Sequence, residues 1–366
     1  MTPRERTLAC LREEPVDRIP VVHFGYWKET LLKWAREGHI SDEEAEAYSD
    51  GNEVDALLCE RLGFDHCWTP AAGSDNFLRP FFEGKVVREL PDGSRHVLNR
   101  EGVIELDVPG RTSIRAEIEH LLVDRESWEN HYKWRLQWDD SRIEGFRNWS
   151  PPAQSRPLGI WCGSLIGNVR NILGVEGLAY MGADDPELLD EIIDTIGALC
   201  LRGVEEGLQY ADCFDFAHFW EDICYNHGPL VNPRFFSEKI VPWYKRMTDV
   251  LGSHGIDLVS VDCDGCIDAL VPLWLEAGVN IMFPIEVGTW NASIRPWREQ
   301  YGRTLKGIGG MRKHVLAGDK AAVDAEIERL KPLIALGGYI PCPDHRIPPE
   351  AKWDLVRYFT DQLRSL

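Results

Sequence analysis

Two aspartates separated by one residue are the strongest chemical signal in this chain. The stretch LVSVDCDG, residues 258–265, runs through apolar residues to two carboxylates and then breaks at a glycine. Side chains of a strand alternate between its two faces, so Asp262 and Asp264 should point one way and Cys263 the other. Two carboxylates held together are costly unless a metal ion, a proton or a cationic group lies between them. The pattern therefore predicts a functional site at the end of a strand.

Other titratable side chains lie at or near the ends of apolar runs. His218 is the next-to-last residue of the run CFDFAHF, and Glu221 lies just after that run as a candidate metal ligand or general acid. Glu286 closes NIMFPIE, and His23 lies late in IPVVHF. Each has a structural alternative, because a carboxylate can bind the free N–H groups of a helix start and a lone histidine on an apolar strand is often a core residue. We take Glu221, His218, His23 and Glu286 as the catalytic candidates.

Strands and helices are expected to alternate along most of the chain. Apolar runs predict strands at 19–24, 65–68, 157–163, 213–219, 257–263, 280–286, 305–309 and 338–342. Helical patterns predict helices near 166–182, 185–209, 232–253, 267–277, 293–302, 320–336 and 349–366. Eight strand–helix units indicate the α/β class and a (β/α)8 TIM barrel. A doubly wound open sheet is the alternative, but its glycine-rich turn after the first strand is missing.

Residues 75–150 break this alternation. The segment KVVRELPDGSRHVLNREGVIEL, residues 85–106, predicts a β-hairpin that turns at Pro91-Asp92-Gly93. We interpret 75–150 as an insertion on the loop side of a single barrel domain spanning 1–366, which also carries an N-terminal helical extension.

The overall composition excludes several classes of partner. A formal net charge of −20 argues against nucleic acid and against an anionic membrane, since both favour Lys and Arg. No run approaches the roughly 18 apolar residues of a membrane span, and the N-terminus MTPRERTLACLREEP has no apolar signal segment. Ten scattered cysteines then indicate reduced thiols and a cytoplasmic protein. The C-x-x-C at 263–266 could suggest redox chemistry or zinc, but no second C-x-x-C completes a four-thiolate site.

Three longer segments resemble the uroporphyrinogen decarboxylase superfamily. They are REEPVDRIPVVHFGYW from residue 12, VDCDGCIDALVPLWLEAGVNIMFPIEVG from residue 261 and GIGGMRKHVLAGDKAAVDAEIERLKPLIALGGYIPCPDHRIPP from residue 307. The resemblance covers nearly the whole chain and is specific from about residue 155. It implies a (β/α)8 barrel whose site lies at the C-terminal mouth.

The resemblance implies one of two chemistries. True uroporphyrinogen decarboxylases need no metal and grip the carboxylates of their substrate with an M-R-Q-A-G-R motif. The corresponding region here is FGYWKE, residues 24–29, which has no arginine pair. The chain is therefore more similar to the other branch, the corrinoid-dependent methyltransferases. These bind zinc through an H-x-C-G motif and a later cysteine near the last strand.

That zinc motif is substituted at each ligand position. Its glycine falls on Gly265, so its histidine falls on Asp262 and its first cysteine on Asp264. The later cysteine falls on or near His345, in the segment 342–345. An Asp/Asp/His set is harder than His/Cys/Cys, yet it can still hold zinc. The resemblance thus implies zinc or another divalent metal at Asp262, Asp264 and His345.

The implied function is methyl transfer from a small O-methylated substrate, aryl ethers included, to a corrinoid. A metal would act as a Lewis acid on the ether oxygen. No D-x-H-x-x-G corrinoid motif occurs in the chain, so a separate corrinoid protein is the expected partner. A homodimer is compatible with the sequence. Two alternatives stay open: a metal-free decarboxylase or other lyase, and a non-catalytic barrel that binds a corrinoid or another ligand.

Overall fold

A closed ring of parallel strands forms the centre of the molecule. The structure, a computed structural model, describes residues 1–110, 114–151 and 155–366. One sheet has the order β15-β14-β13-β12-β9-β8-β3, and β1 pairs with β2. The bounds are β1 Val22–His23, β2 His66–Cys67, β3 Ala72–Gly73, β8 Gly159–Gly163, β9 Phe216–Trp220, β12 Val259–Asp262, β13 Ile281–Phe283, β14 Lys306–Met311 and β15 Tyr339–Pro343.

The ring closes between its first and last strands. β2 pairs with β1 while β3, a few residues later, pairs with β8, so these two short strands fill one position of the barrel. At the other side β1 packs against β15, and a parallel bridge joins Tyr26 to Ile347. Counting β2 and β3 as one position gives the eight positions that the sequence predicted, and the (β/α)8 fold is confirmed.

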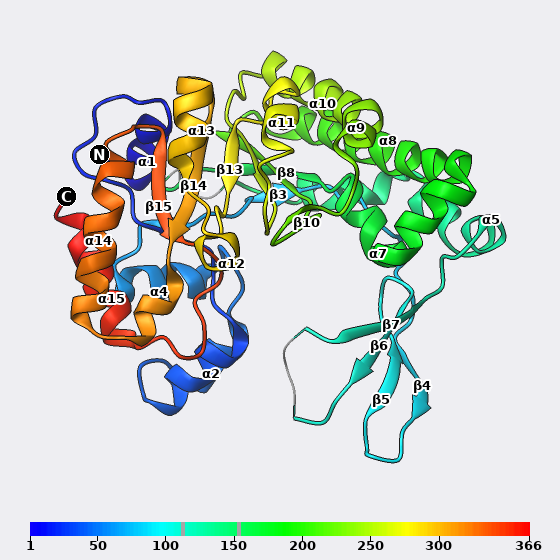
Figure 1. Ribbon diagram of the computed structural model, residues 1–366, viewed down its shortest axis with the longest axis horizontal. Helices are drawn as coiled ribbons and strands as arrows, with labels where there is room; N and C mark the ends of the chain where they lie inside the picture. Colours follow the sequence, from blue (N-terminus) through cyan, green and yellow to red (C-terminus); the bar gives the residue numbers. More distant parts are fainter. Residues whose placement is uncertain (111–113, 152–154) are drawn as a thin grey trace.

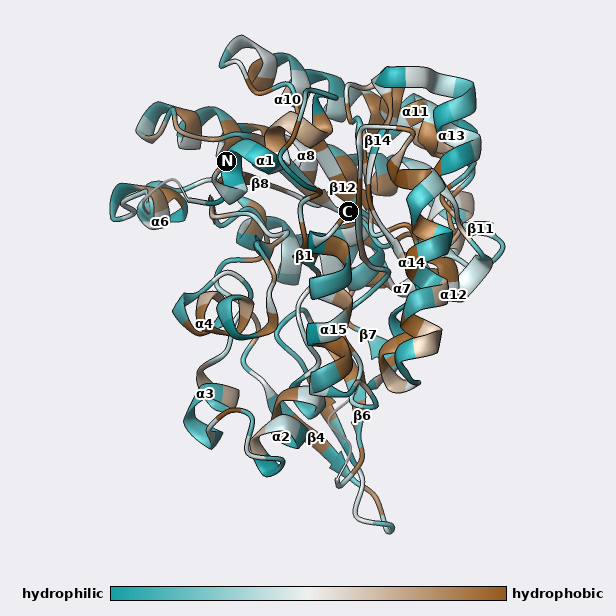
Figure 2. Ribbon diagram, turned by 90° about the vertical axis from the view of Figure 1, so that its left-hand side faces the viewer, coloured by the Kyte–Doolittle hydropathy of each residue, from teal (hydrophilic) through white to brown (hydrophobic). Residues whose placement is uncertain are grey.

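Helices cover the outside of the barrel (Figure 1). In Figure 2 hydrophilic and hydrophobic colours alternate along the helix ribbons, the pattern of helices that turn an apolar face towards the core. No helix among the described residues is both long and apolar enough to cross a bilayer. The bounds are α1 Pro3–Leu11, α2 Lys28–Arg36, α3 Asp42–Ala47, α4 Glu53–Leu62, α7 Ile166–Asp184, α8 Pro186–Tyr210, α9 Pro233–Phe235, α10 Val241–Ser253, α11 Val271–Glu276, α12 Val287–Trp290, α13 Ile294–Tyr301, α14 Lys320–Ile334 and α15 Trp353–Arg364.

Most helices match their predicted ranges, and two differ. The helix expected at 232–253 is divided by a π-helical turn, Phe236–Ile240, between α9 and α10. The helix expected at 267–277 is shorter, because the chain leaves β12 through a loop and α11 begins only at Val271, just before Pro272. Proline is favoured in the first turn of a helix, where its missing N–H has no partner to lose.

The insertion is larger than the predicted hairpin. β4 Lys85–Glu89, β5 Arg95–Leu98, β6 Val103–Asp107 and β7 Ala116–His120 form an antiparallel sheet that extends away from the barrel, on the side where α2 lies (Figure 1). Short helical segments, α5 Arg125–Ser127 and α6 Glu144–Arg147 among them, lead back to β8. Buried Arg142 donates hydrogen bonds to the carbonyls of Gln137, Asp75, Phe77 and Arg135. This side chain therefore ties both ends of the insertion together.

Two buried histidines should make the fold sensitive to acid. Burial lowers the pKa of His66 to about 4 and that of His218 to about 3. A histidine in the unfolded chain has a pKa near 6.5. Below that pH these two histidines therefore bind protons in the unfolded chain but not in the folded one. Stability is therefore complete above about pH 6.5 and falls as the pH drops towards 4, by up to about 1.4 kcal/mol per unit for each histidine.

Urea unfolding of wild type and His218→Asn at pH 7, 6 and 5 tests this expectation. The free energy of unfolding of the variant should fall less steeply below about pH 6.5. Equal slopes for the two proteins would show that His218 does not stay neutral in the folded state.

Candidate active site at the barrel mouth

Four carboxylates gather where β9, β12 and β13 end. They belong to Asp222, Asp262, Asp264 and Glu286. Asp262 is the last residue of β12 and is paired in register with Trp220 of β9 and Phe283 of β13. Burial, and then repulsion from Asp264, Asp222 and Glu286, raises the pKa of Asp262 well above its usual value. The pKa values of Asp222 and Glu286 are also raised, by burial and then by Asp264. These three carboxyl groups therefore hold a proton more strongly than a carboxyl group in water does.

The partners of these carboxylates are unequal. Arg170 lies 3.0 Å from Asp222, and the N–H of Gly265 donates to Glu286 at 2.7 Å. His345 Nε2 lies 3.2 Å from Asp264 Oδ2. Asp262 is only 9% exposed; none of the hydrogen bonds or ion pairs among the described residues reaches its carboxylate, and Arg346 favours its ionised form only from a greater distance. Because a buried unpaired carboxylate is unfavourable, the arrangement fits a site that receives a cation.

The geometry only partly assembles the predicted metal ligands. The 3.2 Å between Asp264 Oδ2 and His345 Nε2 is close to the roughly 3.3 Å expected between two ligands of one tetrahedral zinc ion. Asp264 Oδ1 and His345 Nδ1 are buried without a hydrogen-bond partner. Asp262 does not join these two in a compact set, because the one described group with three ligand atoms all within 4.8 Å of one another is His23, Asp55 and Cys67.

That second group has suitable spacing for a metal but an unfavourable proton arrangement. The N–H of Gly25 donates to His23 Nδ1 at 2.9 Å, so the ring carries a proton on Nε2. Nε2 is the nitrogen that faces Asp55 Oδ1, at 3.3 Å, and Cys59 Sγ, at 3.2 Å. A nitrogen that carries a proton cannot bind a metal. We therefore interpret His23, which is fully buried, as a core residue beside the pairing of β1 with β2, with its Nε2 against Cys59 Sγ and near Asp55 Oδ1.

His218 lies deeper in the barrel than the carboxylates. It is paired in register with Ser260, two residues before Asp262 on the same face of β12, and its Nδ1 lies 2.6 Å from Ser260 Oγ. Phe283 and Trp161 lie around its ring at centroid distances of 6.1 Å. Because burial keeps this ring neutral, His218 can contribute a hydrogen bond below the site but no positive charge.

Glu221 lies among backbone N–H groups, whereas its position after a predicted strand indicated a metal ligand or general acid. It is fully buried and accepts hydrogen bonds from the N–H groups of Leu165, Ile166 and Gly167 at the start of α7. The Tyr244 hydroxyl also donates to it. Its oxygens are therefore occupied by the free N–H groups of a helix start, which favours a structural role over the predicted ligand or acid role.

Glu221→Gln should therefore destabilise the fold by about 2–4 kcal/mol, since the amide places N–H groups against donors and removes the charge from buried hydrogen bonds. Urea unfolding measures this loss. Glu187→Gln, at an exposed position in the first turn of α8, is the control and should change stability by less than about 0.5 kcal/mol. Equal effects of the two variants would contradict the assigned role.

Some residues of the site had weak or no sequence signal. Asp222 follows Glu221 directly, and its carboxylate joins the cluster. Trp27 stacks on His345 at a centroid distance of 5.4 Å, and Phe24 meets the same ring edge-on at 5.3 Å. Only the position of Phe24 and Trp27 after the first strand could have indicated them.

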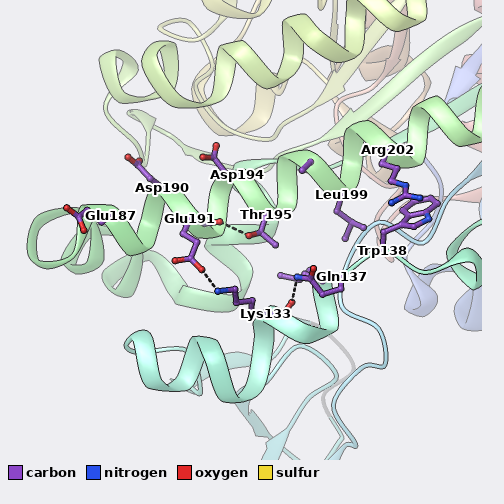
Figure 3. Close-up of a pocket in the computed structure, with 12 residues that line it drawn as sticks. Lys133, Gln137, Trp138, Glu187, Asp190, Glu191, Asp194, Thr195, Leu199 and Arg202 are labelled. Atoms are coloured by element: carbon purple, nitrogen blue, oxygen red, sulfur yellow. Dashed lines mark hydrogen bonds and ion pairs between the residues drawn. The ribbon is translucent and has the colours of Figure 1, made fainter.

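A surface cavity elsewhere contains none of the predicted residues. It has a volume of about 830 Å³ and lies between α8 and the helical turns of the insertion (Figure 3). Three of its four acids have partners: Glu191 pairs with Lys133 and Arg125, both at 2.8 Å, Asp190 pairs with Lys239, and Asp194 accepts from Trp243 Nε1. The cavity therefore lacks the clustered carboxyl groups of raised pKa that mark the barrel mouth.

Comparison with known proteins supports the same family. No family model matches the chain. It is 25% identical over 201 residues to the uroporphyrinogen decarboxylase of Syntrophotalea carbinolica, which is 54% of this chain and 53% of that protein. The chain thus spans about half the length of this curated relative. Its fold is similar to that of a methyltransferase from Methanosarcina mazei, with a TM-score of 0.59, 13% identity and coverage of 100% of this chain and 99% of that one. The resemblance to the uroporphyrinogen decarboxylase superfamily is confirmed.

A further solved structure is less similar to this chain. It is a B12-independent methionine synthase from Shewanella sp. W3-18-1, with a TM-score of 0.47, 10% identity and coverage of 94% of this chain and 96% of that one. The chain is thus similar in sequence to a uroporphyrinogen decarboxylase and in fold to a methyltransferase.

Proposed function

We propose that this chain transfers a methyl group from a small O-methylated substrate to a corrinoid, with a divalent metal ion bound among the carboxylates of the barrel mouth. The observation that carries the proposal is Asp262, a buried carboxylate without a partner beside three others. A corrinoid carried by a separate protein is the proposed methyl acceptor. The superfamily resemblance and the methyltransferase fold support methyl transfer as the reaction class.

The residues have distinct tasks in this proposal. Asp264 and His345 already face each other at ligand spacing, and Asp262 with Glu286 would complete an oxygen-rich set. When bound there, zinc or another divalent ion supplies a Lewis acid that lowers the cost of expelling the substrate oxygen. Phe24, Trp27 and Phe283 form apolar surface beside His345, which keeps water from one side of the site. Arg170 donates to Asp222 at 3.0 Å and so holds that carboxylate in place.

A second candidate is a metal-free decarboxylase or other lyase. The observation that favours it is the raised pKa of Asp262, caused by burial and then by Asp264, because a carboxyl that retains its proton can act as a general acid. The curated relative named uroporphyrinogen decarboxylase belongs to this reaction class. The two candidates differ in whether the carboxylates hold a metal ion.

Metal content and affinity separate the candidates. Protein purified without chelator is analysed by ICP mass spectrometry and titrated with Zn²⁺ and Mn²⁺ by calorimetry, as wild type, Asp262→Ala, Asp264→Ala and His345→Ala. Asp212→Ala, exposed before β9, is the control. About one ion per chain, lost in the three site variants alone, supports the first candidate and leads to assays with cobalt(I) corrinoid. A wild type that binds neither ion overturns it in favour of the lyase.

A further inference from the structure

The ring of His345 is oriented by packing. A metal-binding histidine ordinarily donates its second nitrogen to a carboxylate or carbonyl, which fixes the ring. His345 Nδ1 is buried and has no such partner. Trp27 instead stacks on the ring with an interplanar angle of 23°, and Phe24 contacts it edge-on at 64°. The orientation of Nε2 towards Asp264 therefore depends on how the loop after β15 is held against the loop after β1.

Arg346, the next residue, fixes the loop after β15 through a second contact, an ion pair with Asp50. Its Nη1 donates to Asp50 Oδ1 at 3.0 Å and its Nη2 to Asp50 Oδ2. The Tyr48 hydroxyl donates to the same carboxylate at 2.9 Å. Asp50 belongs to the loop between α3 and α4, far away in the sequence. A two-point contact between a guanidinium and a carboxylate fixes direction as well as distance.

Gly25 leaves room for this pair. Its φ is +91°, and a Cβ there would lie 2.5 Å from both Arg346 Nη1 and Asp50 Oδ1. On either side of it the two loops are joined by backbone hydrogen bonds, from Ile347 N to Gly25 O at 3.0 Å and from Trp27 N to Ile347 O at 3.3 Å. The glycine thus allows the ion pair to sit directly under the contact between the loops.

We propose that Asp50 and Arg346 are positioning residues that set the orientation of His345 towards Asp264. Arg346 acts through the backbone it shares with His345 and through Phe24, whose ring centroid lies 5.8 Å from its guanidinium carbon. Asp50 acts only by holding Arg346. What His345 binds rests on the proposed function, whereas the orientation of its ring does not.

An ordinary structural ion pair would behave differently. The side chains of Arg346 and Asp50 are 29% and 26% exposed, so loss of one charge should cost less stability than in a fully buried pair. Asp50→Asn should therefore leave the protein folded while the ring of His345 moves. Loss of an outer partner of a metal-binding histidine typically lowers metal affinity 10–100-fold, and we expect a decrease of about that size.

The experiment compares Asp50→Asn and Arg346→Lys with a matched pair of the same type. Arg61 makes a two-point contact with Glu44 between α3 and α4 but does not touch the loop after β15, so Glu44→Gln is the control. Histidine-ring NMR of the full chain, with the His345 signal assigned from His345→Gln, reports the ring environment without any metal. Calorimetry with Zn²⁺ reports affinity, and urea unfolding reports stability.

We expect Asp50→Asn and Arg346→Lys to shift the His345 ring signal and weaken Zn²⁺ binding about 10–100-fold, while Glu44→Gln does neither. An unchanged His345 signal in Asp50→Asn would overturn the positioning role. A wild type that binds no metal would instead reject the proposed function, and the ring signal would still decide the positioning role.

Discussion

Asp262→Asn should abolish methyl transfer and at the same time stabilise the protein. The carboxyl group is buried, and repulsion from Asp264 and Asp222 exceeds the attraction of Arg346, so either its ionisation or the retention of its proton at neutral pH costs free energy when no cation is bound. Asparagine keeps the shape and cannot ionise, which should raise the free energy of unfolding by about 1–2 kcal/mol at neutral pH. The same change removes a ligand and should lower the rate at least about 1,000-fold, equivalent to about 4 kcal/mol.

The pair of measurements is urea unfolding of the metal-free protein and methyl transfer to cobalt(I) corrinoid. Asp212→Asn, an exposed aspartate before β9, controls for the change in net charge and should alter neither quantity. Loss of stability in Asp262→Asn would mean that the carboxylate has a stabilising role in the fold. Full activity of Asp262→Asn would show that Asp262 is not part of the active site.

The sequence predicted the barrel because short-range physics determines most of it. Apolar runs of strand length alternate with helical patterns, and each observed barrel strand lies within one residue of, or inside, a predicted range, except β3 and the last two residues of β14. The aspartate pair was visible for the same reason, since a charge at the end of an apolar strand interrupts a local pattern. Fold class and the position of the mouth therefore required no long-range information.

The rest of the site depends on contacts between distant segments. Nothing near Asp50 in the sequence indicates that Arg346 binds it, and nothing near Glu221 indicates that three N–H groups at the start of α7 occupy its oxygens. For His23, the proton position follows from the N–H of Gly25, which only the folded loop brings to Nδ1. Residue type and spacing thus indicate candidate site residues. Their roles depend on which atoms the fold brings into contact with them.

Gly309→Ala is expected to be among the most damaging single substitutions in the barrel. Gly309 has φ +131°, and a Cβ there would lie 1.5 Å from the backbone oxygen of Pro284, in the loop after β13. Backbone cannot move aside as a flexible side chain can, so β14 and the Pro284 loop must separate. Their separation disturbs the hydrogen bond from Gly310 N to Pro284 O, next to the carboxylates of the mouth. We expect a loss of more than about 4 kcal/mol, or failure to fold.

A matched substitution in α10 distinguishes this mechanism from a general effect of glycine replacement. Gly252 lies in the last turn of the helix, and a Cβ there meets no atom within 4 Å. Gly252→Ala should therefore stabilise the protein by up to about 1 kcal/mol, because alanine loses less backbone entropy on folding. Urea unfolding measures both variants, with the yield of folded protein as the readout if Gly309→Ala is insoluble. A Gly309→Ala protein as stable as wild type would show that β14 and the Pro284 loop can separate without loss of stability. It would contradict the idea that close packing of these two segments is needed for the fold.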